Sequence, residues 1–281
     1  MKILITGPNG YIAGRLSGAL TRAGHDVTAI SVRGEEWRGK PFGGFDTLIH
    51  TAAAVHDKRA APGLCKAVNT GLTLELAQKA KDGGVKQFIF FSTMAVYGPE
   101  HTVITPDTPC RPVTPYGVSK WEAERGLEAL AGEHFTVCVL RPPMVYGPDC
   151  PGNYRALRSV ALRSPFVPRL ENRRGTVYVE HLCELTRLLA EHRAGGVFFP
   201  QDAPASTSDM MAWIRESHGL TARGSRLLGA LVNIGARLLP PLKKAFGSLE
   251  YRPDMTACAY GEYRQLSCRQ AVTATEKQWG V

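Results

Sequence analysis

The sequence predicts an α/β protein with a doubly wound parallel sheet and a smaller lobe toward its C-terminal end. One observation is the opening, where an apolar run ending at Thr6 enters the turn Gly7-Pro8-Asn9-Gly10 and then an amphipathic segment reaching about Ala23. A second is the alternation of strand and helix patterns as far as about Leu140. Such alternation is typical of parallel sheets, because parallel neighbours need a crossover connection.

The opening segment predicts a strand, a phosphate-binding turn and a helix. Gly7 permits the tight turn, Gly10 lets the backbone approach a pyrophosphate, and the small Ala13 lets the helix pack on the strand. A second strand follows at about residues 26–31, as a βαβ unit requires, although a purely structural turn is the alternative. Residues 31–46 have room only for a turn and a short strand, so we expect one crossover helix of a complete fold to be missing.

The next elements predict where a ligand would bind. Helices are expected near residues 66–82 and 115–131, and the run 88–91 predicts a buried strand followed by Ser92 and Thr93. In an open parallel sheet the carboxyl ends of the strands face the ligand crevice. Thr93 is therefore a candidate functional hydroxyl, with a plain strand-end hydroxyl as the alternative.

Tyr116 and Lys120 lie four residues apart at the start of a predicted helix. Thr114 fits the N-cap and Pro115 the first helical position, so Tyr116 and Lys120 share one helix face. We expect the Lys120 ammonium to lower the pKa of the Tyr116 hydroxyl, which makes that hydroxyl a better acid or base near neutrality. A solvated lysine at position 120 is the alternative.

Together these features resemble the extended short-chain dehydrogenase/reductase family, in its sugar-nucleotide epimerase/dehydratase group. The resemblance covers almost the whole chain and includes His50-Thr51-Ala52-Ala53 after the fourth strand, Asn69 opening the next helix, and Leu140-Arg141-Pro142-Pro143-Met144-Val145-Tyr146-Gly147-Pro148. It implies a Rossmann-type domain over residues 1–147, with a possible strand around 176–199 returning to it, and a mainly substrate-binding lobe over 148–281. It also implies a homodimer formed through the helices that begin near Asn69 and Pro115.

The resemblance implies a nicotinamide dinucleotide cofactor. The expected cofactor-binding residues are Gly7, Asn9, Gly10, Tyr11, Ile12, Ser31, Arg33, Thr51, Ala52, Ala53, Asn69, Tyr116, Lys120 and Pro143. Where many relatives have an acidic residue for the adenosine ribose, this chain has Ser31-Val32-Arg33, and an arginine can pair with a 2′-phosphate. We therefore favour NADP(H), while Arg33 as a solvated loop residue leaves NAD(H) open.

In the family, the residues matching Thr93, Tyr116 and Lys120 are catalytic. The threonine bonds the reacting sugar oxygen, the tyrosine moves the proton, and the lysine holds the nicotinamide ribose. Family dehydratases place an aspartate and a glutamate directly after the threonine, whereas this chain has Met94 and Ala95. Neither side chain can transfer a proton, which leaves reduction or epimerisation rather than elimination of water.

The resemblance implies a nucleoside diphosphate sugar as the substrate. Expected contacts are Thr93, Met144, Asn153, Arg174 and Arg252, with the two arginines on the diphosphate. Our primary hypothesis is an NADPH-dependent reductase of a 4-keto sugar nucleotide in polysaccharide precursor synthesis. The alternatives are an NAD-dependent nucleotide-sugar 4-epimerase and, less favoured, a non-catalytic dinucleotide-binding sensor.

The composition of the chain indicates which kinds of binding site and partner to expect. The seven cysteines form no C-x-x-C pair and the histidines do not cluster, so neither a metal site nor a disulfide framework is expected. The formal charge is +9, but the basic residues look dispersed and no nucleic-acid motif occurs, so we expect no nucleic-acid partner. Without a transmembrane-length apolar run or a signal peptide, we expect a soluble cytoplasmic protein. The leucine-rich segment 226–242 is a packed helix, a lid or a helix on a membrane surface.

Overall fold

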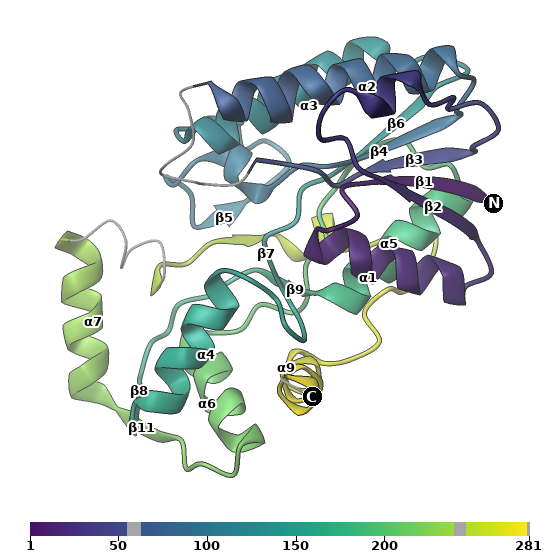
Figure 1. Cartoon of the computed structure of the whole chain (residues 1–281). Coiled ribbons are helices and arrows are strands. Elements are labelled where there is room, and N and C mark those ends of the chain that lie inside the picture. Colours follow the sequence, from purple (N-terminus) through teal and green to yellow (C-terminus); the bar gives the residue numbers. More distant parts are fainter. Residues whose placement is uncertain (55–62, 239–245, 280–281) are drawn as a thin grey trace.

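The computed structural model describes residues 1–54, 63–238 and 246–279 (Figure 1). Its centre is a six-stranded sheet with the strand order β10-β6-β4-β3-β1-β2, in which every neighbouring pair is parallel. The strands are β1 (Lys2–Thr6), β2 (Asp26–Ile30), β3 (Thr47–His50), β4 (Gln87–Phe91), β6 (Thr136–Leu140) and β10 (Gly196–Phe198). The predicted Rossmann-type fold is confirmed.

Helices cover both faces of this sheet. The helices α1 (Tyr11–Arg22) and α5 (Val179–Glu191) pack on one face, and α2 (Leu72–Asp82) and α3 (Pro115–Leu130) pack on the other (Figure 1). Successive side chains of β1 point to opposite faces of the sheet. Ile3 and Ile5 therefore belong to the hydrophobic core beneath α1 and α5, and Leu4 belongs to the core beneath α2 and α3.

The connection from β2 to β3 is shorter than the corresponding connection in a complete Rossmann-type fold. Residues 31–46, all of which are described, contain the 3₁₀ turn η1 (Glu36–Gly39) and neither a crossover helix nor the short strand we expected. The missing helix is confirmed. His50 consequently ends the third strand of the chain rather than the fourth, because the absent strand would have come before it.

Short elements surround the carboxyl edge of the sheet. The segment predicted as one helix over 66–82 is a π-helical turn, η2 (Lys66–Gly71), followed by α2. A 3₁₀ turn, η3 (Met94–Tyr97), follows β4, and β5 (Val103–Ile104) pairs with β12 (Glu250–Tyr251). A further 3₁₀ turn, η4 (Pro253–Thr256), follows β12.

The second lobe lies below the sheet in Figure 1. This lobe contains α4 (Asn153–Arg163), α6 (Thr207–Ser217) and α7 (Arg226–Leu238). Residues 239–242 of the leucine-rich segment lie outside the described residues. The strands β8 (Phe166–Pro168) and β11 (Arg223–Ser225) pair in parallel, and α7 packs against β8. One helix that we did not predict, α9 (Cys268–Gln278), packs on α6. It begins with a capping box, in which Ser267 and Gln270 bond each other's backbone amides, so its signal was present in the sequence.

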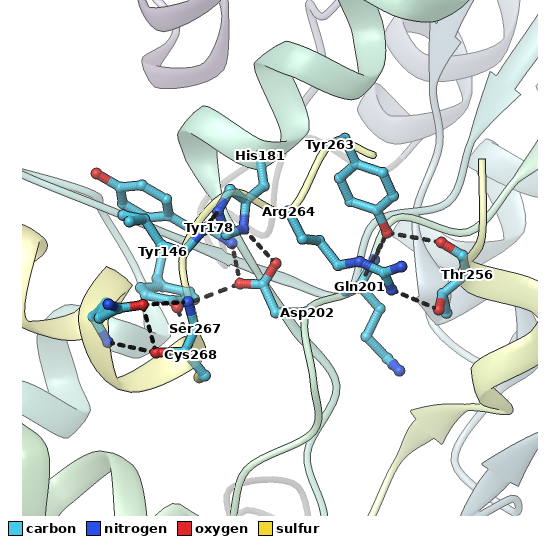
Figure 2. A network of polar contacts seen from close by, with 12 residues as sticks. Tyr146, Tyr178, His181, Gln201, Asp202, Thr256, Tyr263, Arg264, Ser267 and Cys268 are labelled. Carbon is cyan, nitrogen blue, oxygen red and sulfur yellow. Dashed lines mark hydrogen bonds and ion pairs between the residues drawn. The ribbon is translucent and has the colours of Figure 1, made fainter. Parts of the chain in front are cut away.

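A buried network around Asp202 joins the C-terminal segment to α5 and to the end of β9 (Figure 2). The strands β7 (Met144–Tyr146) and β9 (Thr176–Tyr178) pair, and the Asp202 carboxylate accepts the Tyr178 backbone N–H at 2.8 Å. Leu266 N donates to His181 Nε2 at 3.1 Å, so the Nδ1 of that ring carries the proton and donates to Asp202 at 2.7 Å. These bonds fix the chain that leads into α9 against α5.

Membrane-spanning helices and metal-binding clusters are both absent from the described residues. No helix there has both the length and the apolar character needed to cross a bilayer. No group of three or more His, Cys, Asp or Glu side chains there is arranged to hold a metal ion. All seven cysteines carry free thiols.

Candidate active site

The glycine turn presents the N-terminus of α1 to a ligand. Gly7 has a φ of +81°, and a Cβ on it would lie 3.2 Å from the Cα of Ala52, so this position requires glycine. Gly10 N donates to Gly7 O at 2.9 Å, and α1 begins at the next residue with no acidic side chain in its first turn. This geometry suits an anionic group such as a pyrophosphate.

A cavity of about 800 Å³ opens beside this turn. Ten of the predicted cofactor-binding residues line it: Gly7, Asn9, Gly10, Tyr11, Ile12, Ser31, Arg33, Thr51, Ala52 and Ala53. They come from the carboxyl ends of β1, β2 and β3 and from the start of α1, which are distant in sequence and adjacent in the sheet. Its volume and its glycine cradle fit a dinucleotide.

Among the described residues, the four other predicted cofactor contacts do not line this cavity. Asn69 is fully buried. Its Oδ1 accepts the Ala54 backbone N–H at 2.8 Å. Its Nδ2 donates to Ala54 O at 3.0 Å and to Ser119 Oγ at 3.1 Å. It therefore connects the loop after β3, which lines the cavity, to α3. Pro143 lies just before β7, and Tyr116 and Lys120 lie on α3.

The start of α3 has the predicted form. Thr114 Oγ1 accepts the Gly117 N–H at 3.1 Å as the N-cap, and Pro115 occupies the first turn. A Cβ on Gly117 would lie 2.8 Å from Ala95 O, so glycine lets α3 approach η3 closely. The approach brings Tyr116 within hydrogen-bonding reach of the Thr93 side chain. We did not predict this role of Gly117, because a lone glycine within a helix pattern carries no such signal.

The expected lowering of the Tyr116 pKa by Lys120 is wrong. Burial raises the pKa of Tyr116 to about 12, and the hydrogen bond with Thr93 opposes this rise. Lys120 is 1% exposed, donates from Nζ to Phe91 O at 2.7 Å, and has its pKa lowered by burial to about 7, with Glu124 opposing. Burial disfavours the charged form of both groups. Tyr116 is consequently protonated at neutral pH, and its raised pKa makes the hydroxyl a weaker acid than a free tyrosine.

His50 supports the floor of the site as a neutral ring. The pKa of His50 is lowered to about 3, mainly by burial and further by the positive charge of the nearby Lys120. Thr73 Oγ1 donates to Asn69 O at 2.8 Å and so accepts from His50 Nε2 at 3.0 Å, while Thr6 Oγ1 donates to His50 Nδ1 at 2.6 Å. The ring therefore joins β1, β3 and α2 next to Thr51, which lines the cavity.

A buried ion pair supports the end of β4. Glu124 on α3 accepts from Arg141 Nη2 at 2.5 Å, and both side chains are less than a tenth exposed. Ser92 Oγ also donates to Glu124, and Arg141 Nη1 donates to Tyr97 OH at 2.7 Å. The cluster holds β4, η3 and α3 together next to Thr93 and Lys120. The sequence reading missed Glu124, because one glutamate on a helix gives no sign that it is buried.

The predicted substrate contacts other than Thr93 are dispersed. Met144 opens β7, and Asn153 is exposed at the start of α4. Arg174 is half-buried before β9 and donates from Nη1 to Gly247 O at 3.1 Å. Arg252 is exposed and forms a two-pronged pair with Asp254 at 2.6 and 2.7 Å. A diphosphate bound by Arg252 would therefore have to compete with Asp254.

Comparisons with known proteins agree with this architecture. A UDP-glucose 4-epimerase from Vibrio cholerae is 32% identical over 242 residues, which is 74% of this chain and 73% of that protein. A 4-hydroxy-2-methyl-3-oxo-4-farnesyl-3,4-dihydroquinoline-1-oxide ketoreductase from Stigmatella aurantiaca is 26% identical over 92% of this chain and 86% of its own length. The structure of a UDP-glucuronic acid 4-epimerase from Bacillus cereus in complex with NAD superposes with a TM-score of 0.76 at 19% identity, covering 99% of this chain and 98% of that one.

A family comparison covers the part of the chain that contains the candidate site. The model of the NAD dependent epimerase/dehydratase family matches residues 3–198. This range contains the glycine turn, the cavity and the residues Thr93, Tyr116 and Lys120. The chain therefore belongs to the NAD dependent epimerase/dehydratase family.

Proposed function

We propose that the protein is an NADPH-dependent reductase of a 4-keto nucleotide sugar, acting in polysaccharide precursor synthesis. The observation that carries this proposal is the Tyr116 hydroxyl, which is protonated at neutral pH and hydrogen-bonded to Thr93 at the carboxyl end of β4. A reductase needs a proton donor at this position, because the carbonyl oxygen gains a proton when the carbonyl carbon is reduced.

The three residues have distinct roles. Bound nicotinamide supplies the hydride. Thr93 orients and polarises the carbonyl oxygen, and Tyr116 donates its proton to the same oxygen as negative charge develops there. Lys120 holds α3 to the end of β4 through Phe91 O and is a candidate donor to a cofactor ribose. Met94 and Ala95, which follow Thr93, provide no second acid or base.

The cofactor preference rests on the end of β2. Ser31 and Arg33 line the cavity there, and Arg33 is exposed. The described residues that line the cavity include no Asp or Glu, so no side-chain carboxylate there would repel a 2′-phosphate. A guanidinium in this position favours the phosphorylated cofactor.

The cofactor assignment predicts the effect of Arg33→Gln. We expect the variant to bind NADPH about tenfold more weakly and NADH unchanged, because a hydrogen bond to a charged group is worth about 1.5–3 kcal/mol. Fluorescence titration of the cofactor-stripped protein measures both affinities. Arg22→Gln, which removes an exposed arginine at the far end of α1, is the matched control. Equal losses for NADPH and NADH, or tighter NADH binding by the unmodified protein, would show that Arg33 does not select the cofactor.

A nucleotide-sugar 4-epimerase is the second candidate. The 32% identical Vibrio cholerae relative carries the name UDP-glucose 4-epimerase, and an epimerase would use the same Thr93, Tyr116 and Lys120. Addition of UDP-glucose and of a 4-keto-6-deoxy sugar nucleotide in separate assays distinguishes the two. Net NADPH oxidation with the keto sugar alone supports the reductase, and interconversion of UDP-glucose and UDP-galactose without net oxidation supports the epimerase.

A further inference from the structure

The net positive charge of the protein comes from two segments that contain basic residues and no acidic ones. Residues 150–170 contain four arginines and residues 217–249 contain three arginines and two lysines, with no Asp or Glu in either segment. The whole chain has 34 Lys and Arg against 25 Asp and Glu, so the remainder, with 25 of each, is formally neutral. The formal net charge of +9 therefore comes entirely from these segments.

The two segments are neighbours in the second lobe. One contains α4 and β8, and the other contains β11 and α7. β8 pairs with β11, which places the exposed Phe166 opposite the exposed Arg223. The helix α7 packs against β8 and lies at the outer edge of the lobe (Figure 1).

The helix α7 has an apolar face without a partner among the described residues. Leu227, Leu231, Ile234 and Leu238 are between 56 and 74% exposed. Their spacings of four, three and four residues place them on one face of the helix. Solvated apolar side chains in such a row are unusual for a monomeric protein and mark an interaction surface.

The opposite face of α7 is fixed to the lobe. Gly229 is offset from Leu227 by about 200° around the helix. It is buried, and a Cβ on it would lie 2.2 Å from Arg169 O, so the helix contacts the chain after β8 through this glycine. The contact directs the row of Leu227, Leu231, Ile234 and Leu238 away from the protein.

We propose that α7 docks the second lobe on the surface of an anionic phospholipid bilayer. The helix has the features of an interfacial helix, with an apolar face that can enter the acyl boundary and basic residues around it. Arg223 and Arg226 are exposed at its start, and Lys243 and Lys244 follow it in the sequence. Basic residues next to such a helix are attracted to acidic headgroups.

The positive charge of the two segments favours an anionic bilayer, rather than a second copy of the chain, as the partner of α7. A two-fold interface through α7 would place the same basic segments against each other, which like-charge repulsion opposes. An anionic bilayer instead complements both the apolar face of α7 and the positive charge of the two basic segments. A homodimer through α2 and α3, which the family resemblance implies, would leave α7 accessible.

Vesicle sedimentation tests this proposal with the full chain. Vesicles of phosphatidylcholine and phosphatidylglycerol in a ratio of about 2:1 are compared with phosphatidylcholine alone. We expect the protein to bind the anionic vesicles more strongly, and added salt to weaken this binding. The variant Leu231→Asp/Ile234→Asp should lower the bound fraction about tenfold or more. Both side chains are exposed, so the fold does not depend on burying them.

The control adds the same charge elsewhere. Val113→Asp/Val197→Asp changes two exposed valines outside the second lobe and should bind like the unmodified protein. The proposal is overturned if the unmodified protein ignores anionic vesicles or if both double variants bind equally. The proposal is also overturned if the α7 double variant, but not the control, converts a dimer to monomers in the absence of vesicles. The apolar face of α7 would then be a contact between two copies of the chain. None of these readouts depends on the proposed reductase activity.

Discussion

Replacement of Tyr116 by phenylalanine is expected to lower kcat by about 10²- to 10⁴-fold, the usual range for loss of a general acid. The phenol is the proton donor in the proposed reaction, and its pKa of about 12 keeps it protonated at neutral pH. Phenylalanine preserves the ring, and the N-cap bond from Gly117 N to Thr114 Oγ1 does not involve the lost hydroxyl. Steady-state kinetics with NADPH and a 4-keto sugar nucleotide would measure the loss.

Two comparisons separate a chemical effect from a structural one. NADPH affinity of the Tyr116→Phe variant should stay within about threefold, because most predicted contacts line the separate glycine-turn cavity. Tyr260→Phe removes a hydroxyl from an exposed tyrosine that stacks on His192 and should leave kcat unchanged. If Tyr116→Phe turned over as fast as the unmodified protein, Tyr116 would not be the proton donor.

Replacement of Glu124 by alanine is expected to lower the free energy of unfolding by about 3–5 kcal/mol. The carboxylate is the buried counter-ion of Arg141, which is 7% exposed. Its loss leaves that guanidinium without a charge partner in the part of the chain that the structure describes. It also removes the acceptor of the Ser92 hydroxyl. Urea denaturation, followed by circular dichroism, would measure the change.

Glu128→Ala is the matched control for Glu124→Ala. It removes an exposed carboxylate from the same helix, one turn further along, and should change the free energy of unfolding by less than about 0.5 kcal/mol. A loss below about 1 kcal/mol in Glu124→Ala would mean that water or another group compensates Arg141 and that the cluster does not stabilise the end of β4.

Local signals in the sequence identified most of the fold. The glycine turn, the cap at Thr114-Pro115 and the apolar strand before Ser92 each depend on residues close together in the chain, and the structure has all three. The short connection over 31–46 was also visible as a simple lack of residues. The helix α9 was missed although its capping box at Ser267 was readable.

Features that depend on distant contacts could not be predicted. The pKa of Tyr116 follows from burial rather than from the lysine four residues away, and burial is set by how α3 packs on η3. The Glu124–Arg141 pair joins residues 17 apart across two elements. The outward direction of the apolar face of α7 depends on the fit of Gly229 against Arg169.

The proposed reaction is the reduction of a sugar carbonyl with Tyr116 as the proton donor. Its most direct test is transfer of deuterium from the nicotinamide C4 of NADPD to a 4-keto-6-deoxy sugar nucleotide, measured by mass spectrometry of the product. We expect one deuterium to be incorporated for each cofactor oxidised, and this transfer to be lost in Tyr116→Phe. A product without deuterium, or conversion of UDP-glucose to UDP-galactose with the cofactor pool unchanged, would contradict it.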